Sequence, residues 1–446
     1  MNIKRFYLEN KEYFAPVFAI ALPTIADMFV QTLLGFSDMV MVGRIGPEAI
    51  NDVGIGNVPI LFITTIFFAL ATGTTAIMSR AYGTSSKSEG TKIASQTLFI
   101  TLPISIFIML FMLFFADGII NFVSGNGDLK GVRDYYIPAI LGVPFLAINV
   151  IFAGLYRAVG YAKVPMITNI LSVVSNVILN WIFIFELHLG VFGAAIATTA
   201  SRVLVTGVYC YLVFKKKNFW VTLPYYNFKY NHEIASRILR IGVPTMLEQG
   251  LFRVGMIIFE MLVIRLGTIS YAAHKIALTA ESFSFNLGFG FAVASTSLVG
   301  QQLGKGDLDK AKKYAEICTI LAMLVMTIFG LLFFIFPTLI IRVFTDSKEI
   351  QPLASSALKI VSICQPFLAA SMVLSGSLRG AGATKAVLIT TSLGMYLIRV
   401  PMTYTLLHIF NFGLSAAWVV MSFDLSFRCI ANYIVFKNGN WKYIKV

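Results

Sequence analysis

The chain has 446 residues, of which 57% are hydrophobic and 13% are charged, against about a quarter charged in ordinary soluble domains. Its net charge is +14, but the basic residues stand in short loops between apolar runs, which argues against nucleic acid as a partner. The long apolar runs also exclude the alternating pattern of a membrane β-barrel. The composition therefore predicts an all-α integral membrane protein.

Apolar runs separated by glycine, proline and charged clusters predict twelve transmembrane helices, each close to or above the roughly 20 residues that a crossing needs. The longest polar break, residues 215–233, is predicted to be a linker between an N-lobe at 1–214 and a C-lobe at 234–446. The predicted helices are 14–42, 52–80, 93–116, 135–156, 164–185, 190–214, 234–264, 272–302, 314–342, 356–378, 386–408 and 412–436.

The distribution of Lys and Arg predicts the orientation of these helices. One set of ends and loops holds 23 Lys and Arg, and the other set holds seven. Positive charge is retained on the cytoplasmic side, so both termini and the 215–233 linker are predicted to be cytoplasmic. The protein is expected to lie in the cell membrane as a multi-pass chain.

The two halves resemble each other at a nearly constant offset. The offset between Pro23 and Pro244 is 221, and it later grows to 222 and then 223. Six helices per half give both halves the same orientation, so we expect a pseudo-two-fold axis along the membrane normal. The two prolines predict hinges, because each ring removes a backbone hydrogen bond. Further matched pairs are Arg44 with Arg265, Arg157 with Arg379, Lys163 with Lys385, and Gly190 with Gly413.

Polar groups inside the predicted helices are candidates for function, because a charge at that depth costs roughly 2.5–3.5 kcal/mol. Asp38 has no cation three or four residues away, so we favour a functional over a structural role for it. Gln31 lies two turns earlier on a similar face. Asn176 and Asn180 share one face of the fifth helix and either line a cavity or join helices.

Three further acids are candidates for substrate binding. Asp27 and Glu248 each follow a matched proline by four residues. Either they are cavity groups or they cap backbone carbonyls freed by the prolines. Glu281 lies among small and polar residues suited to a water-lined helix face.

The second half also contains intramembrane cations. Arg253 points about 140° away from Glu248 around the helix, so it needs another partner. Arg399 and Glu281 are candidates for a buried network, which either contacts substrate or is a structural salt bridge. Asp424 has Arg428 one turn later, and this pair is interpreted as structural.

No enzyme signature is present in the sequence. It contains neither a GxxxxGK[ST] phosphate loop nor an HExxH metal motif, and its four histidines are isolated. The four cysteines have no CxxC spacing. We therefore expect no enzyme activity and no cofactor, and an energy source other than ATP.

Six stretches together resemble the multidrug and toxic compound extrusion (MATE) family over nearly the whole chain. They are LPTIADMFVQTLLGFSDMVMVGRIG (22–46), GLYRAVGYAKVPMITNILSVVSNVILN (154–180), GVPTMLEQGLFRVG (242–255), ESFSFNLGFGFAVASTSLVGQQLG (281–304), GSLRGAGATK (376–385) and NGNWK (438–442). The resemblance implies a two-lobe antiporter that exports cationic or amphiphilic organic compounds in exchange for H⁺ or Na⁺ by alternating access.

The resemblance also implies roles for single residues. Asp38 matches the coupling aspartate of the first helix, and Gln31 matches a glutamine two turns before it. Asn176 matches the fifth-helix asparagine, and Asn180 falls where some prokaryotic members carry a second aspartate. Members with a C-lobe cation site have a glutamate eight residues after the seventh-helix proline. This chain departs from that pattern, because it has Phe252 there.

Two other functions compete with export of small organic cations. A lipid-linked oligosaccharide flippase of the same superfamily needs a strongly cationic cavity, whereas the intramembrane residues here are mainly acidic. An intramembrane enzyme needs a buried catalytic histidine or a clustered acid and base, which the sequence does not show. A monomer in the lipid bilayer is expected for the transporter.

Overall fold

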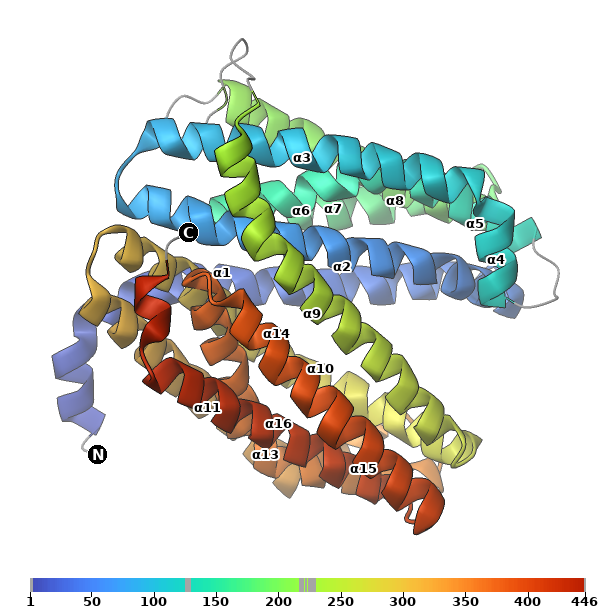
Figure 1. Ribbon diagram of the computed structural model, residues 1–446. Helices are drawn as coiled ribbons and strands as arrows, with labels where there is room; N and C mark the ends of the chain where they lie inside the picture. Colours follow the sequence, from blue (N-terminus) through green and yellow to red (C-terminus); the bar gives the residue numbers. More distant parts are fainter. Residues whose placement is uncertain (1–2, 125–129, 216–219, 221–222, 224–229, 445–446) are drawn as a thin grey trace. The chain divides into compact units, whose positions relative to one another are not determined.

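The computed structural model describes residues 3–124, 130–215, 220, 223 and 230–444, and these residues form helices and short connections without a strand (Figure 1). The first half contains α1 (Ile3–Gly43), α2 (Pro47–Gly83), α3 (Lys87–Phe114), α4 (Ala116–Ser124), α5 (Lys130–Leu141), α6 (Val143–Ala158), α7 (Lys163–Asn180), the π-helical segment η1 (Trp181–Glu186) and α8 (Gly190–Lys215). The second half contains α9 (His232–Ile264), α10 (Thr268–Gly304), α11 (Leu308–Ile335), α12 (Pro337–Arg342), α13 (Ile350–Gly380), α14 (Thr384–Leu393), the π-helical η2 (Gly394–Arg399), α15 (Val400–Tyr404), the π-helical η3 (Thr405–Ile409), α16 (Leu414–Lys437) and the 3₁₀ turn η4 (Asn440–Tyr443).

Each predicted helix overlaps an observed one, but the predicted helix 135–156 is two helices. α5 and α6 meet at a bend of 49°. Pro144 is the second residue of α6, and its ring cannot continue the hydrogen bonding of a preceding helix. α4 was not predicted, and α11 ends just before Pro337. The 215–233 linker lies mostly outside the described residues.

Many helices are suited to a membrane. Within the described residues, ten helices can cross a bilayer by length and composition, or eleven when α5 and α6 form one span. α9 is 33 residues long but is not among them, and it carries Glu248, Arg253 and Glu260. The protein is therefore a multi-pass membrane protein.

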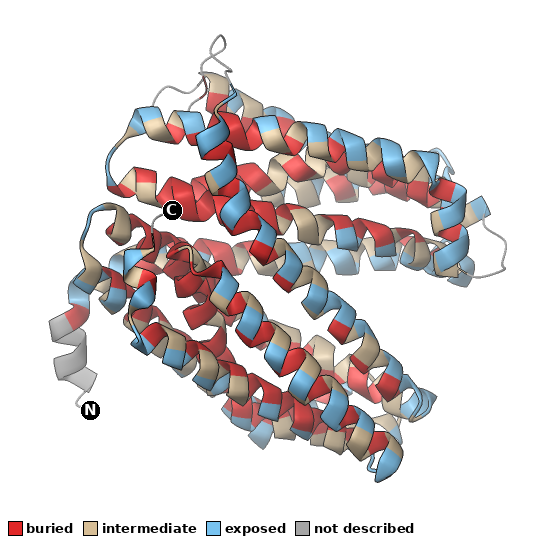
Figure 2. Ribbon diagram, in the orientation of Figure 1, coloured by how far each residue is buried: buried red, intermediate tan, exposed pale blue. Residues whose placement is uncertain are grey.

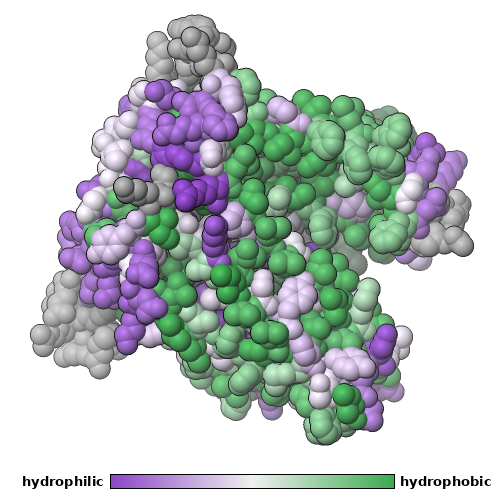
Figure 3. Space-filling view, in the orientation of Figure 1, coloured by the Kyte–Doolittle hydropathy of each residue, from purple (hydrophilic) through white to green (hydrophobic). Residues whose placement is uncertain are grey.

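The outer surface of the helices is apolar. In Figure 3, hydrophobic side chains cover the middles of the helices, and hydrophilic side chains gather toward helix ends. Large apolar side chains are strongly exposed, among them Phe114 at 82% and Leu397 at 67%. Figure 2 shows buried residues on the sides where helices of one bundle face each other. This surface fits lipid and not water.

The chain forms two compact units, and their limits lie inside helices. The N-terminal unit is Ala26–Gly242, and the C-terminal unit is Met1–Ile25 with Val243–Val446. In the N-terminal unit α2 packs on α5 and α6, and α8 packs on α5 and α7. In the C-terminal unit α10, α11 and α16 surround α13. The units differ from the predicted lobes by the first part of α1 and the first part of α9.

Close helix packing explains these limits. The start of α1 packs on α10, where a Cβ on Gly290 would lie 3.0 Å from the carbonyl oxygen of Ala21. The start of α9 packs on α2, where a Cβ on Gly73 would lie 2.9 Å from the nitrogen of Gly242. Ala21 and Gly242 differ by the same offset as the matched prolines, whereas Gly73 and Gly290 are 217 residues apart, so the two contacts are alike but lie about one helical turn out of register. The first part of α1, up to Ile25, thus belongs to the C-terminal unit. The first part of α9, up to Gly242, belongs to the N-terminal unit.

The predicted hinge prolines lie beside these limits. Pro23 is two residues before the limit in α1, and Pro244 is two residues after the limit in α9. Both helices are assigned without interruption through the proline. The hinge role of the two prolines stays a prediction.

Local structure follows the same repeat. Ser86 accepts a hydrogen bond from the Glu89 N–H at 3.3 Å and caps α3. Asp307 lies at the equivalent position of the second half, where it accepts a hydrogen bond from the Lys310 N–H at 2.9 Å and caps α11. This hydrogen bond holds the pKa of the Asp307 carboxyl below its usual value.

The growth of the offset from 222 to 223 also has a structural cause. Lys163 and Lys385 still have the offset 222, whereas Gly190 and Gly413 have the offset 223. In the second half, η3 is the counterpart of η1 of the first half. The counterpart of η2 is an ordinary α-helical part of α7. A π-helical turn closes on the fifth residue and not on the fourth, so it holds one extra residue. η2 therefore accounts for the insertion.

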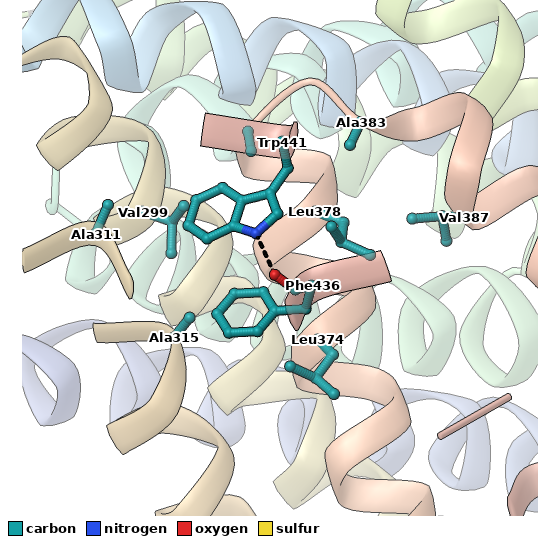
Figure 4. Packing of buried hydrophobic residues seen from close by; sticks show 10 residues of the cluster. Val299, Ala311, Ala315, Leu374, Leu378, Ala383, Val387, Phe436 and Trp441 are labelled. Carbon is teal, nitrogen blue, oxygen red and sulfur yellow. Dashed lines mark hydrogen bonds between the residues drawn. The ribbon is translucent and has the colours of Figure 1, made fainter. Parts of the chain in front are cut away.

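The chain end folds back onto the C-terminal unit. Trp441 is 2% exposed, stacks on Phe436 with ring centres 5.0 Å apart, and donates its indole N–H to the Phe436 carbonyl at 2.8 Å (Figure 4). Gly439 has φ of 76°, which favours glycine and turns the chain. The remaining cluster consists of Val299, Ala311, Ala315, Leu374, Leu378, Ala381, Ala383 and Val387.

The packing of α2 against α9 generates a stability prediction. In Gly73→Ala the new methyl group would meet the backbone at Ile238 and Gly242, so the helices must separate, at a cost of about 1–3 kcal/mol. Gly54 in the same helix has nothing within 4 Å of its Cβ position, so Gly54→Ala should be neutral or stabilising. The stability of both variants is measured by thermal unfolding in detergent. Equal melting temperatures for the two variants would disprove the close approach.

Candidate functional site

Asp38 lies in the second half of α1 and is partly exposed. Its carboxylate accepts a hydrogen bond from the Asn180 amide at 2.6 Å. Asn180 also donates to Asn176 at 2.9 Å, and Asn176 donates to the Thr198 hydroxyl at 3.2 Å. The structure thus brings the three predicted residues Asp38, Asn176 and Asn180 together, and Thr198 of α8 extends the chain of hydrogen bonds.

The surroundings of Asp38 contain no ion pair within the described residues. Arg202 of α8 is close enough for its charge to act on Asp38, and the neutral phenol of Tyr135 of α5 lies near both residues. The amide oxygen of Asn180 is buried and has no hydrogen-bond donor in the described chain. A carboxylate can take up a proton, and together with a free amide oxygen it is suited to a hard cation such as Na⁺, which prefers oxygen ligands.

No group of three or more His, Cys, Asp and Glu side chains gathers around a common point in the part of the chain that the structure describes. Asp38 is therefore a single carboxylate among neutral amides. Gln31 is exposed and donates to Asp27 at 3.4 Å, so it does not join Asp38.

Asp27 belongs to a separate, fully buried cluster in the N-terminal unit. Its carboxylate is 0% exposed and forms an ion pair with Arg157 of α6 at 2.5 Å. The Asn169 amide of α7 also donates to it. These contacts join α1 to α6 and α7.

Glu248 forms the equivalent cluster in the C-terminal unit. Its carboxylate is 2% exposed and accepts two hydrogen bonds from Arg379 of α13, at 2.6 and 3.3 Å. The Thr391 hydroxyl of α14 donates to it at 3.3 Å. Arg379 and Thr391 match Arg157 and Asn169 at the offset 222, so all three members of the cluster repeat.

These clusters argue against one of the two readings of Asp27 and Glu248, the capping of backbone carbonyls, and leave their role in substrate binding a prediction. Neither carboxylate caps a carbonyl freed by a proline, because both accept hydrogen bonds from arginine instead. A buried carboxylate paired with a guanidinium stabilises the fold only while both partners remain. The matched pair Arg157 and Arg379 was visible in the sequence but was not connected to the acids.

Asp424 is at the centre of a third buried cluster. It is 0% exposed and bonds Arg428 one turn later, at 2.8 Å between Nε and Oδ1, so the predicted pair is confirmed. Arg399 also contacts it, at 2.8 Å between Nε and Oδ2. Arg399 lies over the Phe259 ring at 5.6 Å, and Arg428 lies over the Phe252 ring at 5.1 Å.

The predicted network of Arg253, Arg399 and Glu281 exists only in part. Glu281 is 8% exposed and is close enough to Arg399 for their charges to interact. Arg253 is exposed on α9 and forms no ion pair with a described residue. Glu260 pairs with Lys275 at 2.9 Å and not with a neighbour on its own helix.

His274 is a buried polar residue that the sequence analysis missed. It is 0% exposed and packs edge to face against Phe259 and Trp418, with ring centres 5.6 Å apart in both contacts. Neither ring nitrogen has a hydrogen-bond partner in the described residues. Its position inside α10 and its aromatic neighbours indicate a packed neutral ring.

The comparison with known families decides the identity of the fold. A family model described as MatE matches residues 23–182 and again residues 244–405. The chain belongs to the MatE family. The two matches begin at Pro23 and Pro244, which confirms the internal repeat. Members of this family are transporters, so the chain is not an enzyme.

Curated MatE relatives cover nearly the whole chain. A probable multidrug resistance protein NorM of Thermotoga maritima is 29% identical over 95% of this chain and 92% of its own length. A probable multidrug resistance protein NorM of Pasteurella multocida is 27% identical over 87% of this chain and 85% of its own length.

Solved structures share the MatE fold. One is the outward-facing conformation of a multidrug resistance MATE family transporter, with a TM-score of 0.90, 23% identity and 96% of each chain covered. Another, with the same values, is a transporter of the MOP superfamily from Pyrococcus furiosus whose binding pocket has reverse polarity, which suggests a different function for that protein. At this identity the likeness establishes the fold alone.

The buried clusters of this MatE protein generate a second prediction. Asp27→Asn leaves Arg157 buried without a counter-charge, so it should destabilise the protein by about 3–5 kcal/mol. Asp117 pairs with Arg133 at 3.3 Å, but these side chains are 71% and 55% exposed, so Asp117→Asn should cost at most about 1 kcal/mol. Thermal unfolding of both variants in detergent is the measurement. Similar losses of stability in the two variants would contradict a structural role for Asp27.

Proposed function

We propose that the protein is a secondary active efflux transporter that exports cationic or amphiphilic organic compounds in exchange for H⁺ or Na⁺. Asp38 is the coupling carboxylate in this proposal, and Asn176 and Asn180 support it. The multidrug resistance names of the relatives support the substrate class. Small organic cations and the lipid bilayer are then its partners.

One observation carries the role of Asp38. Asp27, Glu248 and Asp424 are each paired with arginine, so their charges are compensated within the protein. Asp38 accepts a hydrogen bond from a neutral amide and forms no ion pair with a described residue. It is also partly exposed, whereas Glu281 is nearly fully buried. Asp38 is therefore the acid whose charge an external cation can compensate.

Exchange follows from competition at this carboxylate. A proton, a Na⁺ ion or a cationic substrate each neutralises Asp38, and one site accepts them one at a time. Binding of the ion from one side releases the substrate, and release of the ion on the other side restores the site. The gradient of the ion then drives export of the compound.

The proposed transporter has twelve crossings. The bent pair of α5 and α6 supplies one crossing, and α9 supplies the twelfth, because its charges Glu248 and Glu260 are paired within the protein. An even number agrees with two cytoplasmic termini, which the excess of Lys and Arg on that side favours. We expect a monomer in the cell membrane.

The central test is the variant Asp38→Asn, which keeps the shape of the side chain and removes its charge. We expect normal expression and loss of gradient-driven ethidium efflux in inverted vesicles. Imposing a Na⁺ gradient and a pH gradient in separate experiments identifies the coupling ion. The proposal is falsified if Asp38→Asn exports ethidium at the wild-type rate under both gradients.

A suitable control changes an aspartate outside the site. Asp309→Asn removes an exposed charge from the first turn of α11 and should leave efflux unchanged. Asp424 does not serve this purpose, because it compensates both Arg399 and Arg428.

The topology is tested independently. A C-terminal alkaline phosphatase fusion should be inactive, because this enzyme needs the oxidising exterior, and a C-terminal green fluorescent protein should be bright. An active phosphatase fusion would reverse the assigned orientation without affecting the role of Asp38.

A further inference from the structure

The internal repeat identifies the residue of the C-terminal unit that corresponds to Asp38. Pro23 with Pro244, and Arg44 with Arg265, share the offset 221 and enclose the relevant part of α1 and α9. The same offset takes Asp38 to Phe259, which is 0% exposed. The position that holds a carboxylate in the N-terminal unit thus holds an apolar ring in the C-terminal unit.

The residues that correspond to Asn176 and Asn180 follow from the extra residue in η2. With the extra residue placed earlier in η2, the offset at its last residue is already 223, which takes Asn176 to Arg399 and Asn180 to Thr403. Burial agrees with this register, since Asn176 and Asn180 are 0% and 1% exposed, and Arg399 and Thr403 are 3% and 0% exposed. The neutral amide of the first unit is therefore a guanidinium in the second.

The counterpart of Asp38 has a cationic neighbour, and this neighbour is the counterpart of Asn176 and not of Asn180. In the N-terminal unit the Asn180 amide donates to the Asp38 carboxylate at 2.6 Å. In the C-terminal unit the Arg399 guanidinium lies over the Phe259 ring at 5.6 Å and contacts Asp424 at 2.8 Å. Phe259 presents an aromatic face, which attracts a cation as a carboxylate does, only more weakly.

The charges around Arg399 are balanced by the protein alone. Arg399 and Arg428 carry two positive charges, and Asp424 and Glu281 carry two negative charges when both are ionised. The neighbouring Lys275 is paired with Glu260 at 2.9 Å, and His274 is a packed ring. An additional cation at this place would have no negative charge left to compensate it.

We propose that Arg399 is a tethered cation that permanently occupies the C-terminal counterpart of the Asp38 site. The inference rests on the proposed role of Asp38 and adds that the protein binds one exchangeable cation per chain. The two halves then have different tasks, although their folds repeat. The N-terminal unit exchanges cations, and the equivalent place in the C-terminal unit holds its cation covalently.

The first measurement is the number of exchangeable cations. Equilibrium binding of tetraphenylphosphonium to the purified full-length protein in detergent should saturate at about one per chain. Asp38→Asn should weaken this binding at least about tenfold, since it removes the only exchangeable site. A second bound cation that survives in Asp38→Asn would overturn the inference while leaving the proposed function intact.

The second measurement is a chemical rescue. Arg399→Ala removes the tethered cation and leaves Asp424 and Glu281 with one negative charge more than Arg428 compensates when both acids are ionised. Millimolar methylguanidinium should then bind in the vacated space and raise the melting temperature of Arg399→Ala by several degrees, relative to NaCl at the same ionic strength. The wild-type protein should show no such rise, because Arg399 fills the space.

Matched variants separate the outcomes. Arg253→Ala removes an exposed arginine and should show no rescue, and Arg399→Lys keeps a cation and should need none. A folded Arg399→Ala protein that methylguanidinium does not stabilise would overturn the inference. If Arg399→Ala does not fold, the inference is tested by the number of cations that the wild-type protein and Asp38→Asn bind. Unchanged binding in Asp38→Asn would contradict the proposed function as well.

Discussion

A charge that is buried within a bilayer needs an opposite charge beside it, and this constraint determines the arrangement of most polar residues in the protein. Asp27 and Glu248 are held by Arg157 and Arg379, and Asp424 is held by two arginines. Each pair joins helices that are distant in the sequence or adjacent turns of one helix. Against this background of internal compensation, a carboxylate with only a neutral partner is conspicuous.

Much of the fold could be predicted, because a membrane helix is a local property of the sequence. Apolar runs of sufficient length identified all the long helices, and the excess of basic residues on one side predicts their orientation. The bend between α5 and α6 was missed, since the apolar pattern continues across Gly142 and Pro144. The limits of the compact units could not be predicted, because they depend on the packing of α1 and α9 on distant helices.

The candidate site was also predicted where it depends on features within one helix, and not where it depends on contacts between distant segments. Asp38 was identified by what its own helix lacks, and Asn176 with Asn180 by their spacing of one turn. The Asp27 partner Arg157 is far away in the sequence, and no helical period reports such a contact. The repeat contained the missing information, because an arginine that recurs at the same place in both halves has the same task in both. Reading matched charges as pairs would have found both clusters.

The division of α1 between the two units has a consequence for biosynthesis. The segment that ends at Ile25 is translated long before the rest of its unit, which begins at Val243. This segment must wait in the membrane, with Asn10 and Thr24 not yet buried, until more than half of the protein has been translated. Contacts between segments so far apart in sequence form late and slowly. The N-terminal unit therefore does not include the first part of α1, and this part completes its packing only after the helices of the C-terminal unit have been made.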